Sequence, residues 1–354
     1  MTVPLQIGSE SVTPGQRRII ELALPSLYGH ARMAMPVHVL RGRRPGPTLL
    51  VSAAVHGDEI NGVEIARRLL GMRLIRRLRG TLICVPVVNV YGFVNRSRYM
   101  PDRRDLNRSF PGSDHGSTTA RLARLFLDEV AHHASHVLDL HTAAVYRTNL
   151  PQIRAHLADE VTSSMAISFG SPVILDSNLL DGSFRAEAAK LGIPMLVFEG
   201  GEALRFEELV VRAGLRGVLD VMRTLGMLPA RRRPRGGPSP VVARSSVWIR
   251  ADRSGVLRTS MALGTHVRKG DILGYIGDPL SQDAGAVVSA SDGILIGRVT
   301  LPLVNEGEAL FHLAKFRDPQ AVGEQLEEYH ESLIESDHLA DSGAMMADGD
   351  RSGG

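Results

Sequence analysis

The stretch VSAAVHGDEINGVEIARRLL, Val51 to Leu70, changes from a strand pattern to a helix pattern within a few residues. Its first five residues are mostly apolar, as in a buried strand, and from Ile60 onward apolar side chains recur at helical spacing. Three ionisable residues, His56, Asp58 and Glu59, lie at the junction. They are typical either of a polar turn that begins a helix or of a metal site. The rest of the chain has to distinguish these two interpretations.

The 354-residue chain has the composition of a soluble globular protein, with 44% hydrophobic and 22% charged residues. Its single cysteine, Cys84, excludes intrachain disulfides and cysteine-rich zinc knuckles, so a metal site must use His, Asp and Glu. The N-terminus lacks a signal-peptide pattern, and no uncharged apolar run reaches the roughly 20 residues of a membrane span. We therefore expect a cytoplasmic protein with no membrane partner.

The net charge of +3 reflects two basic runs, RLIRRLRG at 73–80 and RRRPRGG at 231–237. Such runs can bind nucleic acid, but no aromatic residues interleave these arginines to stack on bases. We interpret them as a solvated helix end and a linker, and expect no nucleic-acid partner.

Up to about residue 228, strand and helix patterns alternate. Strands are predicted at 36–42, 47–55, 81–90, 135–143, 171–176 and 193–201, and helices at 60–70, 118–133, 184–192 and 206–228. The last helical stretch contains Gly214 and is expected to form two packed pieces. Residues 91–113 read as a long polar loop, and loops of that length are usually functional. The alternation predicts an α/β fold with a mostly parallel, mixed sheet flanked by helices.

Four segments are predicted along the chain. Residues 1–228 would form the α/β domain, 229–245 a Pro/Arg-rich linker, 246–316 a smaller all-β domain, and 317–354 an acidic, partly disordered tail. The β domain resembles biotinyl/lipoyl-type folds, although the segment at its hairpin tip has no lysine for a carrier group. We interpret it as a structural or substrate-gating module.

Ionisable residues recur where the predicted strands end, at the edge of a parallel sheet where ligands bind. His56 and Glu59 follow one strand, His141 closes another, and Glu199 closes a third. Two histidines and one carboxylate are a typical ligand set for a catalytic zinc with an open position for water. Glu199, outside this set, is the candidate general base. Any one of these residues alone could be structural, but the four together favour a zinc site.

The segments HGDEINGVE, SRYMPDRRDLNRSFPG, DLHTA and FEGG resemble the succinylglutamate desuccinylase/aspartoacylase family, a branch of the zinc carboxypeptidase-like fold. The resemblance covers roughly residues 36–225, and DLNRSFPG is its most specific part. It implies one Zn²⁺ per chain, bound by His56, Glu59 and His141, with Glu199 as general base and acid. Asp58 is therefore not expected to be a ligand.

The resemblance also assigns residues in the long loop. Asn107 and Arg108 correspond to the pair that grips the substrate carboxylate, and Arg98 to the arginine that polarises the scissile carbonyl. A guanidinium matches a carboxylate geometrically, and a fixed cation stabilises a developing oxyanion. Asp105 and Asp139 are expected to orient an arginine or a ligand histidine, or to be structural.

The sequence thus predicts a zinc-dependent amidohydrolase that cleaves an N-acyl amino acid, or a similar small acylated amine, with a zinc-activated water. Its partner would be a small carboxylate-bearing substrate, and a homo-oligomer is left open. A zinc carboxypeptidase would use the same residues and is the nearest alternative. A catalytically inactive binding module is the remote alternative.

Overall fold

The computed structural model describes residues 4–28, 32–230, 240–280 and 283–317, together with 319, 322–326 and 328–329. Most of the predicted linker, residues 231–239, lies outside the described residues, as does the acidic tail from residue 330 onward.

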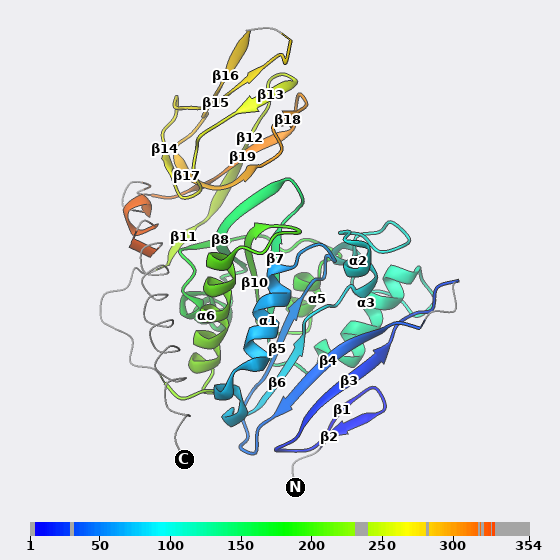
Figure 1. Cartoon of the computed structure of the whole chain (residues 1–354). Coiled ribbons are helices and arrows are strands. Elements are labelled where there is room, and N and C mark those ends of the chain that lie inside the picture. Colours follow the sequence, from blue (N-terminus) through cyan, green and yellow to red (C-terminus); the bar gives the residue numbers. More distant parts are fainter. Residues whose placement is uncertain are drawn as a thin grey trace, which may run out of the picture.

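One mixed sheet organises the fold, with strand order β12-β19-β17-β8-β10-β7-β5-β6-β4-β3 (Figure 1). The central strands β10, β7, β5 and β6 are parallel, and the strands on both flanks are antiparallel. The strands from the first part of the chain are β3 Arg17–Ala23, β4 Ala34–Arg41, β5 Thr48–Ala53, β6 Thr81–Val85, β7 His136–Ala143, β8 Arg147–Ala155 and β10 Met195–Glu202. Two short strands, β1 Leu5–Ile7 and β2 Glu10–Val12, form a separate hairpin.

Helices cover both faces of this sheet (Figure 1). The helices are α1 Asn61–Gly71, α2 Val90–Asn95, α3 Thr118–Glu129, α4 Glu160–Phe169, α5 Phe184–Lys190 and α6 Glu208–Thr224, with 3-10 turns η1 Arg73–Arg77, η2 Leu106–Arg108 and η3 Ala131–His133. Buried side chains of α1, α4 and α6 form one core with the sheet, and those of α3 and α5 form a second core with the β1–β2 hairpin. The predicted α/β class is confirmed.

The stretch 206–228 contains one continuous helix, α6, so the expected division at Gly214 is wrong. Gly214 is buried, and a Cβ at this position would lie 2.3 Å from the Ile65 Cδ1 of α1. A glycine inside a helix costs only about 1 kcal/mol relative to alanine, which does not end a helix that packs well on both sides. Gly214 instead allows α1 and α6 to approach closely.

The predicted strand at 81–90 is also too long, because β6 ends at Val85 and the helix α2 begins at Val90. The Asn89 side chain caps that helix by accepting a hydrogen bond from the Gly92 N–H at 2.8 Å. Residues 91–113, predicted to be a loop, therefore begin inside a helix and also contain η2. Asparagine is a favoured N-cap residue, but the apolar run in which Asn89 lies resembles a continuous strand.

Residues 144–170 had no predicted element, yet they form β8 and α4. β8 contains Pro151 and has an irregular register against β10 between Glu199 and Gly201. A bulge interrupts the period-2 pattern by which strands are predicted, so β8 could not be identified from hydrophobicity alone.

The C-terminal strands form the β region at the top of Figure 1. They are β12 Ser245–Arg250, β13 Gly255–Arg258, β14 His266–Val267, β15 Ile272–Gly277, β16 Ala284–Val288, β17 Gly293–Val299, β18 Leu303–Val304 and β19 Ala309–Lys315. β17 pairs antiparallel with β8, so the main sheet continues into this region. Two further short strands, β9 Val173–Asp176 and β11 Val241–Ala243, pair in parallel beside β8, although β11 lies in the predicted linker.

His312 of β19 is buried in this region, where its ring stacks on Trp248 with centroids 4.3 Å apart. Burial, assisted by Arg154, lowers the pKa of His312 to about 3.

We expect this histidine to make the protein sensitive to acid. The unfolded chain takes up the proton below about pH 6.5, whereas the folded protein does not. The contribution of neutral His312 to the free energy of unfolding is therefore fully present above pH 6.5. It decreases by about 1.4 kcal/mol per pH unit as the pH falls toward 3. Denaturant unfolding of metal-free protein between pH 4 and 7 would measure this loss. The variant His312→Gln should have a shallower slope, and equal slopes would contradict the assignment.

Candidate metal centre and active site

The site residues lie where β5, β7 and β10 end, as neighbours in the sheet. His141 lies on β7, and Glu199 of β10 is its register partner. Side chains of laterally paired residues project from the same face, so Glu199 and His141 lie on one side of the sheet. His56 and Glu59 lie in the turn between β5 and α1. The structure thus brings together three segments that are far apart in the sequence.

His56, Glu59 and His141 form a compact, buried cluster. Glu59 Oε1 lies 2.7 Å from His56 Nδ1, and Glu59 Oε2 lies 2.7 Å from His141 Nδ1. One nitrogen or oxygen of each residue lies within 4.8 Å of those of the other two. All three side chains are at most 5% exposed. The cluster is the one His/Cys/Asp/Glu group with this geometry in the described part of the chain.

A second carboxylate holds the outer nitrogen of each imidazole. Asp105 Oδ1 lies 3.2 Å from His56 Nε2, and Asp139 Oδ2 lies 2.7 Å from His141 Nε2. Asp139 is itself fixed by a hydrogen bond of 2.6 Å from the Ser52 hydroxyl. This arrangement favours the tautomer with the proton on Nε2, so that the Nδ1 lone pairs face the space beside Glu59 where a cation would bind. Arg98 Nη1 also lies 3.2 Å from His56 Nδ1. Both aspartates thus contact histidines of the cluster, and that these histidines are metal ligands stays a prediction.

The donor set fits zinc, which favours imidazole nitrogen and carboxylate oxygen. Burial alone would raise the pKa of Glu59, but His56 and His141 hold this pKa well below its usual range. Burial likewise would lower the pKa of His141, whereas Asp139 and Glu59 raise it well above its ordinary value. The carboxylates therefore stabilise positive charge at the centre of the cluster, whether it is carried by protons or by a metal.

The turn that carries His56 and Glu59 is held by close backbone contact. The Glu59 N–H donates to the His56 carbonyl at 3.1 Å. Gly57, between them, packs against α2 so tightly that a Cβ would lie 2.0 Å from the Gly92 carbonyl carbon.

We expect Gly57→Ala to displace this turn, because overpacking against backbone costs about 1–3 kcal/mol. Both the melting temperature and the zinc content should fall, as measured by calorimetry and metal analysis. Gly71→Ala, at the end of α1, is the matched control, since no atom lies within 4 Å of its added Cβ. If the melting temperature and zinc content of Gly57→Ala equalled those of Gly71→Ala, the turn would tolerate a side chain at residue 57.

Arg98 reaches the cluster from the segment after α2. Its Nη2 donates to Asp105 Oδ2 at 2.9 Å, and its Nη1 lies 3.4 Å from Glu59 Oε1. Burial would lower the pKa of Arg98, but Glu59 and Asp105 raise it. The guanidinium is therefore a fixed cation beside the cluster.

Asn107 and Arg108 lie on η2, which Asp105 caps by accepting from the Asn107 N–H at 2.8 Å. The Asn107 side-chain oxygen accepts from the Phe184 N–H at 2.9 Å, which joins this loop to α5. Arg108 is exposed and donates to the Asn107 carbonyl at 2.6 Å. Asp105 thus links η2 directly to His56.

Glu199 is held by two residues of β8, a strand that the sequence pattern does not predict. Asn149 Nδ2 donates to Glu199 Oε2 at 2.7 Å. Arg154 Nε lies 2.9 Å from Glu199 Oε1 as an ion pair, without the alignment of a hydrogen bond. Asn149 is also the register partner of Gly297 of β17. A Cβ added to Gly297 would lie 2.7 Å from Asn149 Oδ1. The C-terminal β region therefore touches the residue that holds Glu199.

Asp58 is also buried at the cluster, and its Oδ1 has no hydrogen-bond partner among the described residues. Burial and the neighbouring Glu59 raise its pKa. Asp58 is not part of the His56–Glu59–His141 group, and that it is no ligand stays a prediction.

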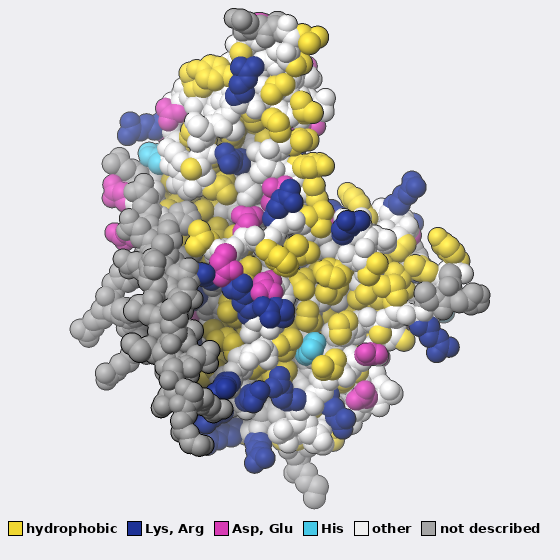
Figure 2. All heavy atoms as spheres, in the orientation of Figure 1, with side chains coloured by type: hydrophobic (Ala, Val, Ile, Leu, Met, Phe, Trp, Pro, Cys, Tyr) yellow, Lys and Arg dark blue, Asp and Glu magenta, His cyan; other side chains and the backbone are white. Residues whose placement is uncertain are grey.

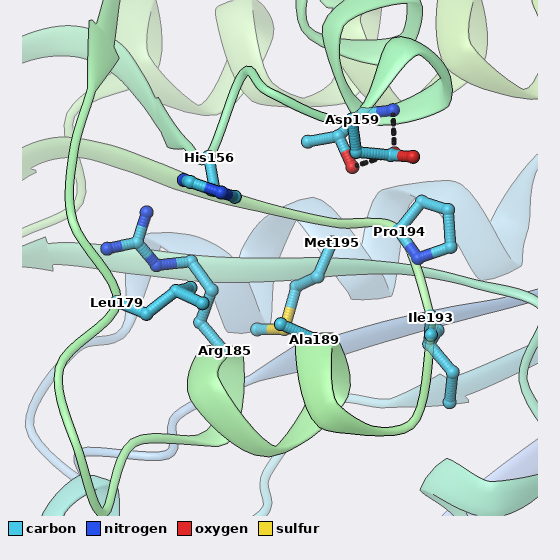
Figure 3. A pocket seen from close by; sticks show the side chains of 10 residues that line it. His156, Asp159, Leu179, Arg185, Ala189, Ile193, Pro194 and Met195 are labelled. Atoms are coloured by element: carbon cyan, nitrogen blue, oxygen red, sulfur yellow. Dashed lines mark hydrogen bonds between the residues drawn. The ribbon is translucent and has the colours of Figure 1, made fainter.

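A separate cavity of about 190 Å³ lies at the other end of β10, beside Pro194 and Met195 (Figure 3). The Arg185 side chain extends toward His156 in this view, and its Nη1 donates to the Ser177 hydroxyl at 2.7 Å. Glu199 is four residues farther along the strand than Met195, or about 13 Å at 3.3 Å per residue. The cavity is therefore not the space in front of the metal cluster.

Comparison with known proteins identifies the family. Residues 45–225, more than half of the chain, match the succinylglutamate desuccinylase/aspartoacylase catalytic domain. The chain belongs to this family. The resemblance seen in the sequence is thus confirmed, and with it membership of a family of deacylases, which are hydrolases acting on amides.

Relatives in this family align with most of the chain. An N-alpha-acetyl-L-2,4-diaminobutyric acid deacetylase from Halomonas elongata is 26% identical over 79% of this chain and 85% of the relative. A succinylglutamate desuccinylase/aspartoacylase structure from Rhodobacter sphaeroides is 27% identical, with a TM-score of 0.76 over 86% of this chain and 96% of that one. A product-bound structure of the ectoine utilization protein EutE (DoeB) from Ruegeria pomeroyi shares the fold. It has a TM-score of 0.77 at 22% identity and covers 89% of this chain and 100% of that chain.

No helix in the described ranges of the protein is both long and apolar enough to span a bilayer.

Proposed function

We propose that the protein is a zinc-dependent deacylase that hydrolyses the amide bond of an N-acyl amino acid or a similar small acylated amine. It would thus act on linear amides other than peptide bonds. The observation that carries the proposal is the buried His56–Glu59–His141 cluster, whose outer imidazole nitrogens are both held by carboxylates. Membership of a deacylase family supports the same reaction class.

One Zn²⁺ per chain would be held by His56, Glu59 and His141. When bound, zinc polarises a carbonyl and lowers the pKa of water, so that a nucleophile exists near neutral pH. Arg98, fixed by Asp105, would stabilise the negative charge that develops on the carbonyl oxygen. Asn107 and Arg108 would hold the substrate carboxylate and so set the position of the scissile bond.

Glu199 would act at one of its carboxylate oxygens. It would accept a proton from the attacking water as the C–O bond forms, and would then donate that proton to the amine nitrogen, so that the C–N bond breaks and the amine leaves. The Asn149 amide and the Arg154 guanidinium would hold this carboxylate in one orientation before the reaction begins.

We expect Asn149→Ala to lower kcat by about tenfold, because a hydrogen bond to a charged group contributes about 1.5–3 kcal/mol. KM and zinc content should not change, since Asn149 contacts neither the cluster nor η2 in any described hydrogen bond. Thr148→Ala, one residue earlier on β8, is the control. A rise in KM or a loss of zinc without a fall in kcat would contradict a role in positioning Glu199.

We further propose that residues 1–228 form the hydrolase domain and that residues 246–316 form a β domain that supports it. The pairing of β17 with β8, which brings Gly297 against Asn149, is the contact on which this support would depend.

Turnover assays of the zinc-loaded protein would test the proposed reaction. The substrates should include N-acetyl and N-succinyl amino acids, N-acetyl-2,4-diaminobutyrate and short peptides. We expect hydrolysis of one or more acyl-amino acids and none of the peptides. Release of C-terminal residues from peptides would favour a carboxypeptidase instead, and no turnover with full zinc occupancy would favour a binding module.

A further inference from the structure

A strongly basic hollow lies at the edge of the sheet opposite the metal cluster. It has a volume of about 750 Å³ and lies between the turn before β3, the turn from β4 to β5, and η1. β5 and β6 begin at this edge, whereas the metal cluster lies where the parallel strands end. The hollow is therefore separate from the proposed active site.

Six arginines line this hollow, and none of the described residues that line it is acidic. They are Arg17, Arg41, Arg43, Arg44, Arg76 and Arg77. Figure 2 shows dark-blue side chains gathered below α1, with no magenta side chains among them. The six come from three separate parts of the chain, so the fold, rather than one basic run, gathers this charge.

Arginines outside the hollow, on the neighbouring helix α1, are paired with carboxylates. On α1, Arg67 pairs with Glu64, and Arg68 pairs with both Glu64 and Glu208. In the hollow, Arg17 and Arg41 donate to backbone carbonyls, of Leu70 at 3.4 Å and Val12 at 2.7 Å.

The other four arginines of the hollow form no ion pair or side-chain hydrogen bond within the described ranges of the chain. They are Arg43, Arg44, Arg76 and Arg77. All four are exposed, so their guanidinium groups are available to a ligand from solution.

The charge and the volume of the hollow indicate which class of ligand would bind there. Like charges gathered in a concavity repel one another and raise the local concentration of anions. The planar guanidinium binds phosphate through two parallel hydrogen bonds. No aromatic residue is among the described residues that line the hollow, so a base would have no stacking surface there. A volume of this size suits a small molecule better than an extended chain.

We propose that this hollow binds a compact polyphosphate anion with at least three phosphate groups, such as inorganic tripolyphosphate or a nucleoside triphosphate. Arginines of the β4–β5 turn and of η1, which line the same hollow, would both contact the anion. The phosphates, rather than the base, are the recognised groups. This site is independent of catalysis at the zinc cluster.

Titration calorimetry of the full chain with sodium tripolyphosphate would test the proposal. We expect one equivalent to bind, with an affinity that falls steeply between 50 and 200 mM salt, as contacts between arginine and phosphate require. Equal affinity for ATP would show that the triphosphate is the group recognised. Binding no tighter than that of sulfate would overturn the proposal.

Charge-reversal variants would locate the site. Arg76→Glu with Arg77→Glu should weaken tripolyphosphate binding by more than about tenfold, since two bidentate contacts are replaced by repulsion. Arg121→Glu with Arg258→Glu makes the same change in net charge at exposed arginines outside the hollow and should leave the affinity nearly unchanged. Equal loss in both double variants would overturn the assignment. Tighter binding of a 20-nucleotide single strand, at several proteins per strand, would identify an extended nucleic-acid surface instead.

Discussion

Replacing Glu199 by glutamine is expected to lower kcat by about 10²–10⁴, the usual contribution of a positioned general base. Glutamine keeps the volume of the side chain and can still accept the hydrogen bond from Asn149. It cannot take a proton from water near neutral pH. Because Glu199 is outside the His56–Glu59–His141 cluster, zinc content should stay at one per chain. Steady-state kinetics with metal analysis on the same preparation would measure both quantities.

Glu202→Gln is the matched control, since Glu202 lies on the same strand and accepts a hydrogen bond from the Tyr146 N–H at 3.0 Å. It should retain nearly full kcat. Full activity of the Glu199→Gln variant would show that Glu199 is not the general base. Loss of zinc from that variant would instead indicate that Glu199 supports the metal.

Replacing His141 by alanine is expected to remove most of the zinc, because a site with three protein ligands loses one of them. The change also leaves the buried Asp139 without its 2.7 Å partner. Activity should fall with the metal content. Dialysis against buffer followed by metal analysis would measure the occupancy, and circular dichroism would show whether the variant is folded.

Two further variants make this test quantitative. Asp139→Asn should weaken zinc affinity by about 10–100-fold, as is typical when the partner of a ligand histidine is altered. His136→Ala, at the start of the same strand and outside the cluster, should leave the zinc content unchanged. Full occupancy in His141→Ala would exclude His141 from the ligand set.

Much of the site could be predicted because its residues follow strands that are easily identified. β5, β7 and β10 are short apolar runs, and polar residues directly after such runs stand at one edge of the sheet. The order HGDE, DLH and FEGG was therefore sufficient to predict a shared site. That His56, Glu59 and His141 act as zinc ligands stays a prediction until the metal is measured.

The residues around Glu199 were not predictable in the same way. β8 is irregular and contains a proline, so neither the strand nor Asn149 and Arg154 could be recognised from periodicity. In α6 the sequence pattern instead predicts a break that does not exist. Gly214 resembles a helix break, but it lets the helix pack closely against Ile65. In both places, packing between distant segments outweighed the local pattern.

Local periodicity and short motifs are enough to specify the α/β class, the family and the types of residue gathered at the strand ends. The folded chain is needed to show that Asp105 and Asp139 hold the imidazoles, and that β17 places Gly297 against Asn149. It also shows that arginines from three segments line one hollow. These features depend on contacts between residues far apart in the chain, which no local pattern encodes.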